Sequence, residues 1–188
     1  MPYDLLTFSR QIDAEVALRT LRARDAPALY ALIDGNRRHL REWLPFVDDA
    51  QDVTDTQRFI LEAARLADEQ KGMAAGIWDG ETLAGVIGLM EISARNRNAE
   101  IGYWLGVEHQ GRGLVTRACR ALITYAFDTV ALHRVEIYCA PKNARSRAIP
   151  ERLGFVIEGT LREAEWLYDH YVDNVLYAML APAWDAGS

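Results

Sequence analysis

The spacing of hydrophobic residues changes along the chain, and each spacing predicts a different element. Apolar and polar residues alternate over 16–22, which indicates a half-buried strand. Helical spacing follows over 26–33, after the capping residue Asp25, and again over 37–43, with Gly35 between the two stretches. We therefore expect one strand and two short helices at the start of the chain.

A longer helix is predicted next from a capping box, in which two polar side chains bond the free N–H groups of a helix start. Thr54 and Gln57 have the required spacing. Apolar residues then recur at helical intervals, and Gly72 is expected to close the element.

Three strands are predicted after this helix. Apolar runs over 73–78 and 82–92 are joined by Asp79 and Gly80, and Asp-Gly between apolar runs is a strong hairpin signal. A third run over 99–107 follows a polar loop. Together the three runs indicate an antiparallel meander.

The last part of the chain alternates between strand and helix. The predicted elements are a helix over 114–127, a strand over 135–140, a helix over 143–153 and strands over 155–160 and 172–180. Strands and helices in this order predict an α/β (α+β) fold, with a mixed, mostly antiparallel sheet flanked by helices.

Composition narrows the class of protein. The 188 residues carry a net charge of −6 and 50% hydrophobic side chains, which is typical of a single globular domain, here 1–188. An acidic chain is a poor match for direct nucleic-acid binding. No apolar run is long enough for a membrane span, and no secretory leader follows Met1, so we expect a cytoplasmic location. Cys119, Cys139 and the four histidines have no metal-ligand spacing, so no metal is expected.

A basic segment runs against this acidic background. Between residues 112 and 152, arginine and lysine clearly outnumber aspartate and glutamate. Such a segment favours a small anionic ligand, although surface ion pairs on helix faces would explain it equally well.

A glycine-rich turn lies just before the helix predicted at 114–127. It reads Gln110-Gly111-Arg112-Gly113, and a turn of this kind lets backbone N–H groups and the helix dipole meet one anion. The hydroxyl of Thr116 and the charge of Arg112 or Arg117 would add to such a site. The turn is neither a Walker loop nor a dinucleotide fingerprint, and an ordinary glycine turn is the alternative.

Three motifs in order resemble one enzyme family. They are A-E-I-G-Y-W-L at 99–105, Q-G-R-G-L-V-T at 110–116, and Asn143 with Ser146 followed by R-L-G-F at 152–155. The chain resembles the GNAT acyl-CoA transferases, and among them the RimJ/RimL branch of ribosomal-protein N-acetyltransferases, over about residues 14–182.

The resemblance implies a cofactor site for acetyl-CoA between two strands that splay apart. Strand amides at the end of the 99–107 run would polarise the thioester, and the glycine turn would bind the pyrophosphate. The implied cofactor-binding residues are Leu105, Gly106, Val107, Gln110, Gly111, Arg112, Gly113, Leu114, Val115, Thr116, Asn143 and Ser146. Asn143 would also suit helix N-capping.

The chain departs from the family pattern at two positions. Val115 stands where relatives have a small residue, which predicts tighter packing beside the pyrophosphate. Pro150 stands where many relatives have a proton-donating tyrosine, so that role cannot be transferred. The resemblance instead implies Ser146 as the donor to the leaving thiolate, and Pro150 is expected to kink its helix.

A pair of carboxylates is the predicted proton acceptor. If Ile92 pairs with Ala99, then Glu91 lies directly opposite Glu100, and like charges in a strand pair raise one pKa. The hypothesis is that Glu100, coupled to Glu91, is the general base. Two exposed surface charges are the alternative.

The expected reaction is direct transfer of acetyl to an amine. The favoured acceptor is the N-terminal α-amine of a protein, as in the ribosomal-protein enzymes, and a pocket is expected from Trp43, Trp104, Tyr168 and Tyr171. A small amine such as a polyamine or antibiotic, or a coenzyme-A-binding module without turnover, are the alternatives. Members of this branch often pair, but no apolar seam in the sequence predicts a homodimer interface.

Overall fold

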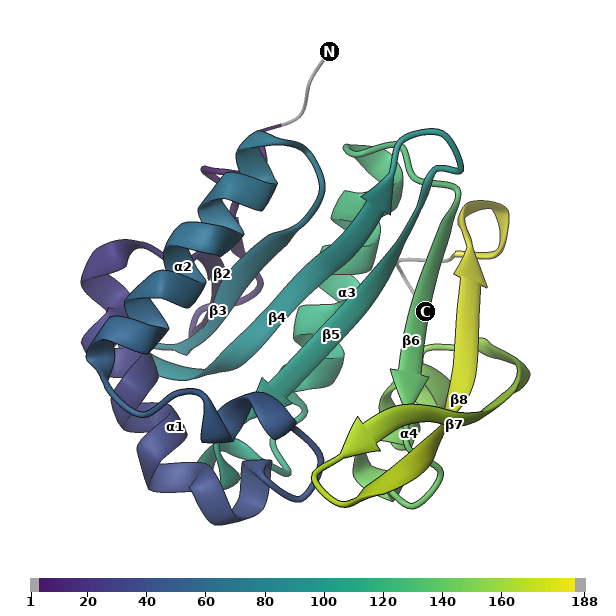
Figure 1. The fold of residues 1–188 in the computed structure, drawn as a ribbon. Coiled ribbons are helices and arrows are strands. Elements are labelled where there is room, and N and C mark those ends of the chain that lie inside the picture. The colour runs from purple at the N-terminus through teal and green to yellow at the C-terminus, as the bar shows by residue number, and fades with distance from the viewer. Residues whose placement is uncertain (1–3, 185–188) are drawn as a thin grey trace.

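A single mixed sheet organises the molecule in the computed structural model, which describes residues 4–184 (Figure 1). The prediction that no secretory leader follows Met1 involves residues 1–3, which lie outside the described residues. The strand order is β1-β2-β3-β4-β5-β6-β8-β7, and the β5–β6 neighbours are parallel whereas the other neighbours are antiparallel. The predicted fold class is confirmed.

The elements cover most of the described chain. The strands are β1 Ser9–Gln11, β2 Val16–Thr20, β3 Met73–Asp79, β4 Thr82–Ser93, β5 Asn98–Leu105, β6 Arg134–Cys139, β7 Val156–Leu167 and β8 His170–Leu180. The α-helices are α1 Ala26–Leu40, α2 Val53–Asp68, α3 Leu114–Asp128 and α4 Ala144–Arg152.

Two hydrophobic cores lie on opposite faces of the sheet. Leu29 and Leu32 of α1 and Ile60 of α2 pack against one face of β3 and β4. Leu122 of α3 belongs to the core on the other face, which also contains Ile101 of β5. In Figure 1 α1 and α2 accordingly lie in front of the sheet, whereas α3 lies behind it. Each face of the sheet is therefore covered by its own helices.

The first helix is longer than the sequence predicts. Two helices separated by Gly35 were expected, but α1 runs through this glycine without interruption. A glycine inside a helix costs only about 1 kcal/mol relative to alanine. The burial of Ile33 and Leu40 on the same helix outweighs that cost, so the prediction of a break was wrong.

The second helix starts at a different capping box from the one predicted. The N-cap is Asp52, whose Oδ1 accepts from the N–H groups of Thr54 at 2.6 Å and Asp55 at 3.1 Å. The Asp55 carboxylate accepts in return from the Asp52 N–H at 3.2 Å. Thr54 therefore lies inside the first turn, because a carboxylate two residues earlier makes the same contacts.

The last hairpin is also longer than predicted. The meander over β3–β5 is confirmed, but β7 and β8 extend beyond the predicted strands 155–160 and 172–180. Register shifts interrupt the β7–β8 pairing twice, which obscures the alternation that sequence patterns rely on. The tip of this hairpin reaches toward the segment between α1 and α2 (Figure 1).

The parallel pair β5–β6 separates soon after it forms. Within residues 4–184 the two strands pair at three positions, Asn98 with Arg134, Ala99 with Val135 and Glu100 with Glu136. Both strands continue past this point, β5 to Leu105 and β6 to Cys139. They diverge toward the bottom of Figure 1, so backbone groups of β5 face an opening in the sheet.

The substitution Gly35→Ala is expected to stabilise the fold by about 0.5–1 kcal/mol, because an added methyl group meets no atom within 4 Å and the residue lies in a helix interior. Urea unfolding measures the change. Gly88→Ala is the matched control, because its Cβ would lie 2.5 Å from the Met73 carbonyl oxygen and must destabilise the protein. A destabilised Gly35→Ala variant would contradict this account of α1.

Candidate active site

The glycine turn before α3 has the conformation that an anion site needs. Gly111 and Gly113 have φ angles of 76° and 71°, in the left-handed region that favours glycine. A Cβ at either position would meet nothing within 4 Å, so the space beside the turn is open. Gly113 is the N-cap of α3 and has no side chain to bond the amides of the first turn. These backbone N–H groups are therefore available to a ligand.

The side chains predicted to support this turn are used elsewhere. The Arg112 guanidinium pairs with Asp79, and the Arg117 guanidinium pairs with Asp13. The Thr116 hydroxyl accepts from Arg152 at 2.9 Å. These side chains are therefore bound to other residues of the protein, whereas the main chain of the turn is open to a ligand.

Two arginines of α4 supply positive charge near the turn. Arg145 donates to the Gln110 side-chain oxygen at 2.8 Å, and Arg152 reaches Thr116 in α3. Within residues 4–184 neither forms an ion pair, and both are exposed. The basic segment around α4 indicated such residues, but the sequence did not distinguish them from Arg112 and Arg117.

Strand amides at the end of β5 face in alternate directions. The Gly106 N–H donates to the Ala84 carbonyl at 2.9 Å, on the side of β4. Neighbouring amides of a strand point to opposite sides, so the Leu105 N–H faces the opening toward β6. The Val107 N–H donates to Asn36 Oδ1 at 2.8 Å. Of the predicted trio Leu105, Gly106 and Val107, only Leu105 therefore has an amide directed into the opening.

Ser146 lies on the α4 side of this opening. Its N–H donates to Asn143 Oδ1 at 3.1 Å, so Asn143 is the N-cap of α4, as one of its two predicted roles required. Its hydroxyl lies 3.2 Å from the Cys139 sulfur and 3.4 Å from the Tyr103 hydroxyl. Burial raises the pKa of Tyr103, so Tyr103 stays a hydrogen-bond donor.

Pro150 explains why Tyr103 points at this serine. In a regular helix the N–H of residue 150 would donate to the carbonyl of Ser146, but proline has no N–H. The Tyr103 hydroxyl donates to that carbonyl instead, at 3.0 Å. A tyrosine from β5 thus reaches the end of the opening and contacts the backbone of α4. The sequence could not show this contact, because it joins residues 43 positions apart.

Glu100 lies on the face of the sheet opposite to the one that Tyr103 and α3 occupy. It shares that face with Trp104, which packs against the α1–α2 core, whereas Ile101 and Tyr103 face α3. The predicted register to Glu91 is wrong, because Met90 is the residue opposite Glu100. An irregularity follows Met90, where Glu91 takes a φ of 52°, and local alternation cannot reveal such a bulge.

The environment of Glu100 favours its protonated form. Burial and then the nearby carboxylates of Glu91, Glu136 and Glu165 raise the pKa of Glu100 to about 7. Glu91 therefore interacts with Glu100 as predicted, although it is not its strand partner. Sequence reasoning missed Glu136 and Glu165, which come from β6 and β7. A glutamate with this pKa can exchange protons near neutral pH.

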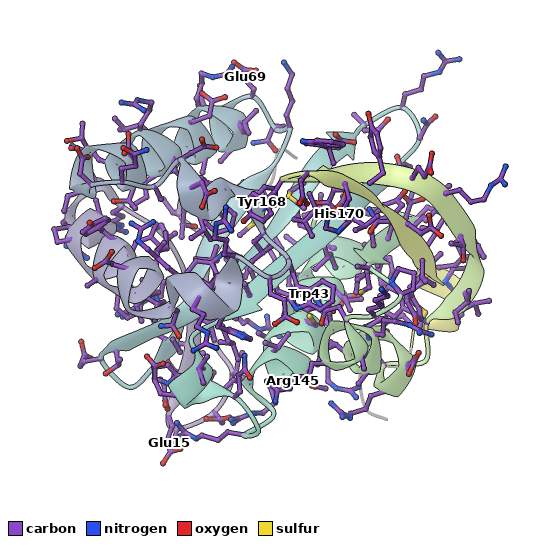
Figure 2. All side chains as sticks on the ribbon, turned by 60° about the horizontal axis from the view of Figure 1, so that its bottom comes forward. Glu15, Trp43, Glu69, Arg145, Tyr168 and His170 are labelled. Atoms are coloured by element: carbon purple, nitrogen blue, oxygen red, sulfur yellow. The ribbon has the colours of Figure 1, made fainter. Side chains whose placement is uncertain are left out.

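Aromatic residues surround this face to different degrees. Trp104 lies with its ring 6.0 Å from that of Phe46. Tyr168, at the tip of the β7–β8 hairpin, donates to the Leu44 carbonyl at 3.2 Å, which fastens the hairpin to the segment after α1. Figure 2 brings this end of the molecule forward, with Tyr168, Trp43 and Arg145 labelled toward its middle.

The fourth predicted pocket residue lies apart from this group. Tyr171 is exposed, and its ring stacks edge-on against Trp166 with 4.8 Å between ring centroids. Its contact is with the hairpin itself. The structure therefore joins Trp104 and Tyr168 to the α1–α2 connection, and leaves Tyr171 on the outer surface.

Other functional groups are sparse. Cys119 and Cys139 are free and buried. Within residues 4–184, no three histidine, cysteine, aspartate or glutamate side chains gather in a way that would hold a metal ion. No helix in the same part of the chain is both long enough and apolar enough to cross a lipid bilayer.

The family is established by comparison with known proteins. A model described as acetyltransferase (GNAT) domain matches residues 15–156. The chain therefore belongs to the GNAT acetyltransferases, and the resemblance seen in the sequence is confirmed.

Individual relatives and structures agree with this family. A Bacillus subtilis (strain 168) protein, YdaF, provisionally named a ribosomal N-acetyltransferase, is 38% identical over 95% of this chain and 98% of its own. The ribosomal-protein-serine acetyltransferase of Escherichia coli (strain K12) is 33% identical over 93% of this chain and 98% of its own. RimL, a ribosomal L7/L12 α-N-protein acetyltransferase solved with coenzyme A, superimposes with a TM-score of 0.89 at 26% identity, covering 92% of this chain and 98% of that chain.

The protein is accordingly an N-acetyltransferase that uses acetyl-CoA. The structure fits this cofactor at the place where a pyrophosphate requires donors. The space beside Gly111 and Gly113 is open, and the first turn of α3 has unused amides.

The link between Tyr103 and Pro150 can be tested with a double-mutant cycle. Tyr103→Phe removes the donor to the Ser146 carbonyl and is expected to destabilise the protein by about 1–2 kcal/mol. In the Pro150→Ala background the helix regains an N–H for that carbonyl, so the same change is expected to cost about 1 kcal/mol less. Denaturant unfolding of the four proteins measures both values. Additive effects would show that Pro150 does not govern this contact.

Proposed function

We propose that the protein transfers the acetyl group of acetyl-CoA to the N-terminal α-amine of a protein, with a ribosomal protein as the favoured acceptor. The names of the two relatives and of RimL support this acceptor class. The single observation that carries the proposal is the separation of β5 from β6 after Glu100, because it opens the sheet between two chemically different faces.

The opening lets the two faces act on one reaction. Glu100 approaches from the face of α1 and α2, and Ser146 approaches from the face of α3 and α4. An acceptor on the Glu100 side and a leaving group on the Ser146 side would then lie in line through the sheet. Such an arrangement separates proton removal from thiolate stabilisation.

Glu100 is proposed as the general base. An α-amine has a reference pKa of about 7.7–8.0, whereas a lysine side chain has about 10.4. With a pKa of about 7, Glu100 can take a proton from an α-ammonium across a gap of about one unit, directly or through a water. A lysine ammonium would require more than three units, so the match favours N-terminal acceptors.

The cofactor is proposed to bind along the opening through main-chain donors. The amides of residues 111–116 would hold the pyrophosphate, and Arg145 and Arg152 would add charge nearby. Bound acetyl-CoA supplies the acetyl group as a thioester, whose C–S bond breaks as the acceptor nitrogen forms the amide. The Leu105 N–H would donate to the carbonyl oxygen as negative charge develops there.

Ser146 is proposed to donate a hydrogen bond to the departing sulfur rather than to give up its proton. Its hydroxyl has two neighbours, Cys139 and Tyr103, from which it would turn toward the opening. Trp43, Trp104 and Tyr168 are proposed to form the acceptor pocket on the other side. Glu91 contributes by its charge, and Tyr171 has no direct role in this arrangement.

An acceptor panel tests the function directly. Thiol release from acetyl-CoA is measured with peptides that carry a free α-amine, the same peptides blocked at the N-terminus but containing lysine, and a polyamine. Release with the free peptides only, with mass spectrometry locating the acetyl group on the N-terminus, is the expected result. Preference for the polyamine would replace the proposed acceptor, and binding of acetyl-CoA with no release for any amine would replace the enzymatic role.

The substitution Glu100→Gln tests the base. In the unmodified enzyme kcat/KM is expected to fall as the pH drops below about 7, because a protonated Glu100 cannot accept a proton. In the variant kcat/KM is expected to fall by about 10²-fold or more, and the limb near pH 7 is expected to be replaced by the titration of the acceptor α-amine at its reference pKa of about 7.7–8.0. Steady-state rates between pH 5.5 and 8 measure both, and an unchanged profile would eliminate Glu100 as the base.

A further inference from the structure

Glu136 lies beside Glu100 on the neighbouring strand and belongs to none of the motifs that indicated the site. The two residues are register partners in the last recorded pair of the parallel β5–β6 ladder. Both lie on the sheet face away from α3, since Val135 and Ile137 fill the core on the α3 side. Glu136 is thus adjacent to the proposed base at the point where the sheet opens.

The carboxylate of Glu136 is held in place from two sides. Arg134 Nε donates to its Oε1 at 2.6 Å, and the Tyr138 hydroxyl donates to its Oε2 at 3.0 Å. Arg134 is itself fixed by two bonds, at 2.8 and 2.5 Å, to the carboxylate of Glu158 on β7. Burial and the Glu136 carboxylate raise the pKa of Tyr138 to about 12, so Tyr138 stays a donor at neutral pH.

These contacts fix a negative charge beside Glu100. Arg134 and Tyr138 both act as donors to the Glu136 carboxylate. The same contacts hold the carboxylate between Arg134 and Tyr138 on its own strand.

We propose that Glu136 is a positioning residue for the transferase reaction, which keeps Glu100 ready to receive a proton from the acceptor by holding a fixed carboxylate on the adjacent strand. This inference rests on the proposed role of Glu100 as the base. Glu136 itself needs no contact with the acceptor or the cofactor, and it acts on the reaction only through its neighbour.

Other charged groups face Glu100 from the surrounding elements. Glu91 approaches from β4 and Glu165 from β7, while Tyr138 and Arg134 lie on β6 with Glu136. Glu91 has the largest effect of the three carboxylates on Glu100, but it is exposed and lies in the irregular part of β4. Glu165 accepts a bond from Asn174 at 3.3 Å and has no cation bound to it within residues 4–184. Of the three carboxylates, Glu136 is the one in strand register with Glu100 and fixed by two donors.

The test is the pH dependence of kcat/KM in Glu136→Gln. The acid limb is the part of the profile in which kcat/KM falls as the pH falls. Removal of the Glu136 charge is expected to move this limb to lower pH by about half to one unit. Because Glu100 becomes a weaker base, the plateau is expected to fall by roughly twofold to threefold. A variant that is only structurally damaged would lose rate without moving the limb, so an unmoved limb would overturn the inference.

Glu158→Gln is the matched control. It makes the same carboxylate-to-amide change in the same Arg134 network, but Glu158 is not among the carboxylates that act on Glu100. In Glu158→Gln the acid limb is expected to stay within about 0.2 pH unit of that of the unmodified enzyme, since the charge of Glu158 is remote and screened. A shift equal to that of Glu136→Gln would assign the effect to the network as a whole and overturn the specific role of Glu136.

Arg134→Gln provides a second variant if Glu136→Gln does not fold. It leaves Glu136 charged and removes the neighbouring cation, so the acid limb is expected to move to higher pH. An acid limb at the same or at a lower pH would overturn the inference. Glu100→Gln separates the hypothesis that Glu100 is the base from the hypothesis that Glu136 positions it. If Glu100→Gln keeps the limb, the proposed base is wrong; if it loses the limb while Glu136→Gln leaves it in place, only the role of Glu136 is wrong.

Discussion

The structure depends on the interrupted pairing between β5 and β6. Three residue pairs join the strands, and beyond Glu100 and Glu136 the strands part. Continuous hydrogen bonding would close the sheet and leave no place where its two faces communicate. The helices that cover each face make the interruption tolerable, because α1 and α2 hold the β3–β4 side whereas α3 spans the core shared by β5 and β6. The opening is therefore the place where two neighbouring strands lose their pairing while the helices hold the sheet together.

Charge is distributed unequally around that opening. Near the glycine turn the side chains of Arg112 and Arg117 are neutralised by aspartates, so the positive potential comes from backbone amides and from α4. On the opposite face carboxylates accumulate around Glu100 with Arg134 as the cation bound among them. An anionic ligand and a cationic one are thus drawn to different sides of the same sheet, which suits a reaction between acetyl-CoA and an ammonium group.

The sequence predicted the elements whose conformation depends on residues that are close together in the chain. The Asp79–Gly80 hairpin and the glycines before α3 were found because their backbone conformations demand those residues. The environment of Glu100 was only partly predicted. The bulge at Glu91 shifts the register, and Glu136 becomes a neighbour through a parallel pairing that no local pattern encodes. Tyr103 was missed for the same reason, because its partner is a carbonyl freed by a proline far along the chain.

The glycine turn has a consequence for how this protein can change during evolution. Its donors belong to the peptide backbone, so exchanging the side chain at Arg112 or Val115 removes none of them. If the turn binds the cofactor as proposed, side chains on its surface can change while nucleotide affinity persists, provided that Gly111 and Gly113 keep their left-handed geometry. In the proposed arrangement acceptor preference would depend on side chains across the sheet, and it could diverge without loss of the shared donor molecule.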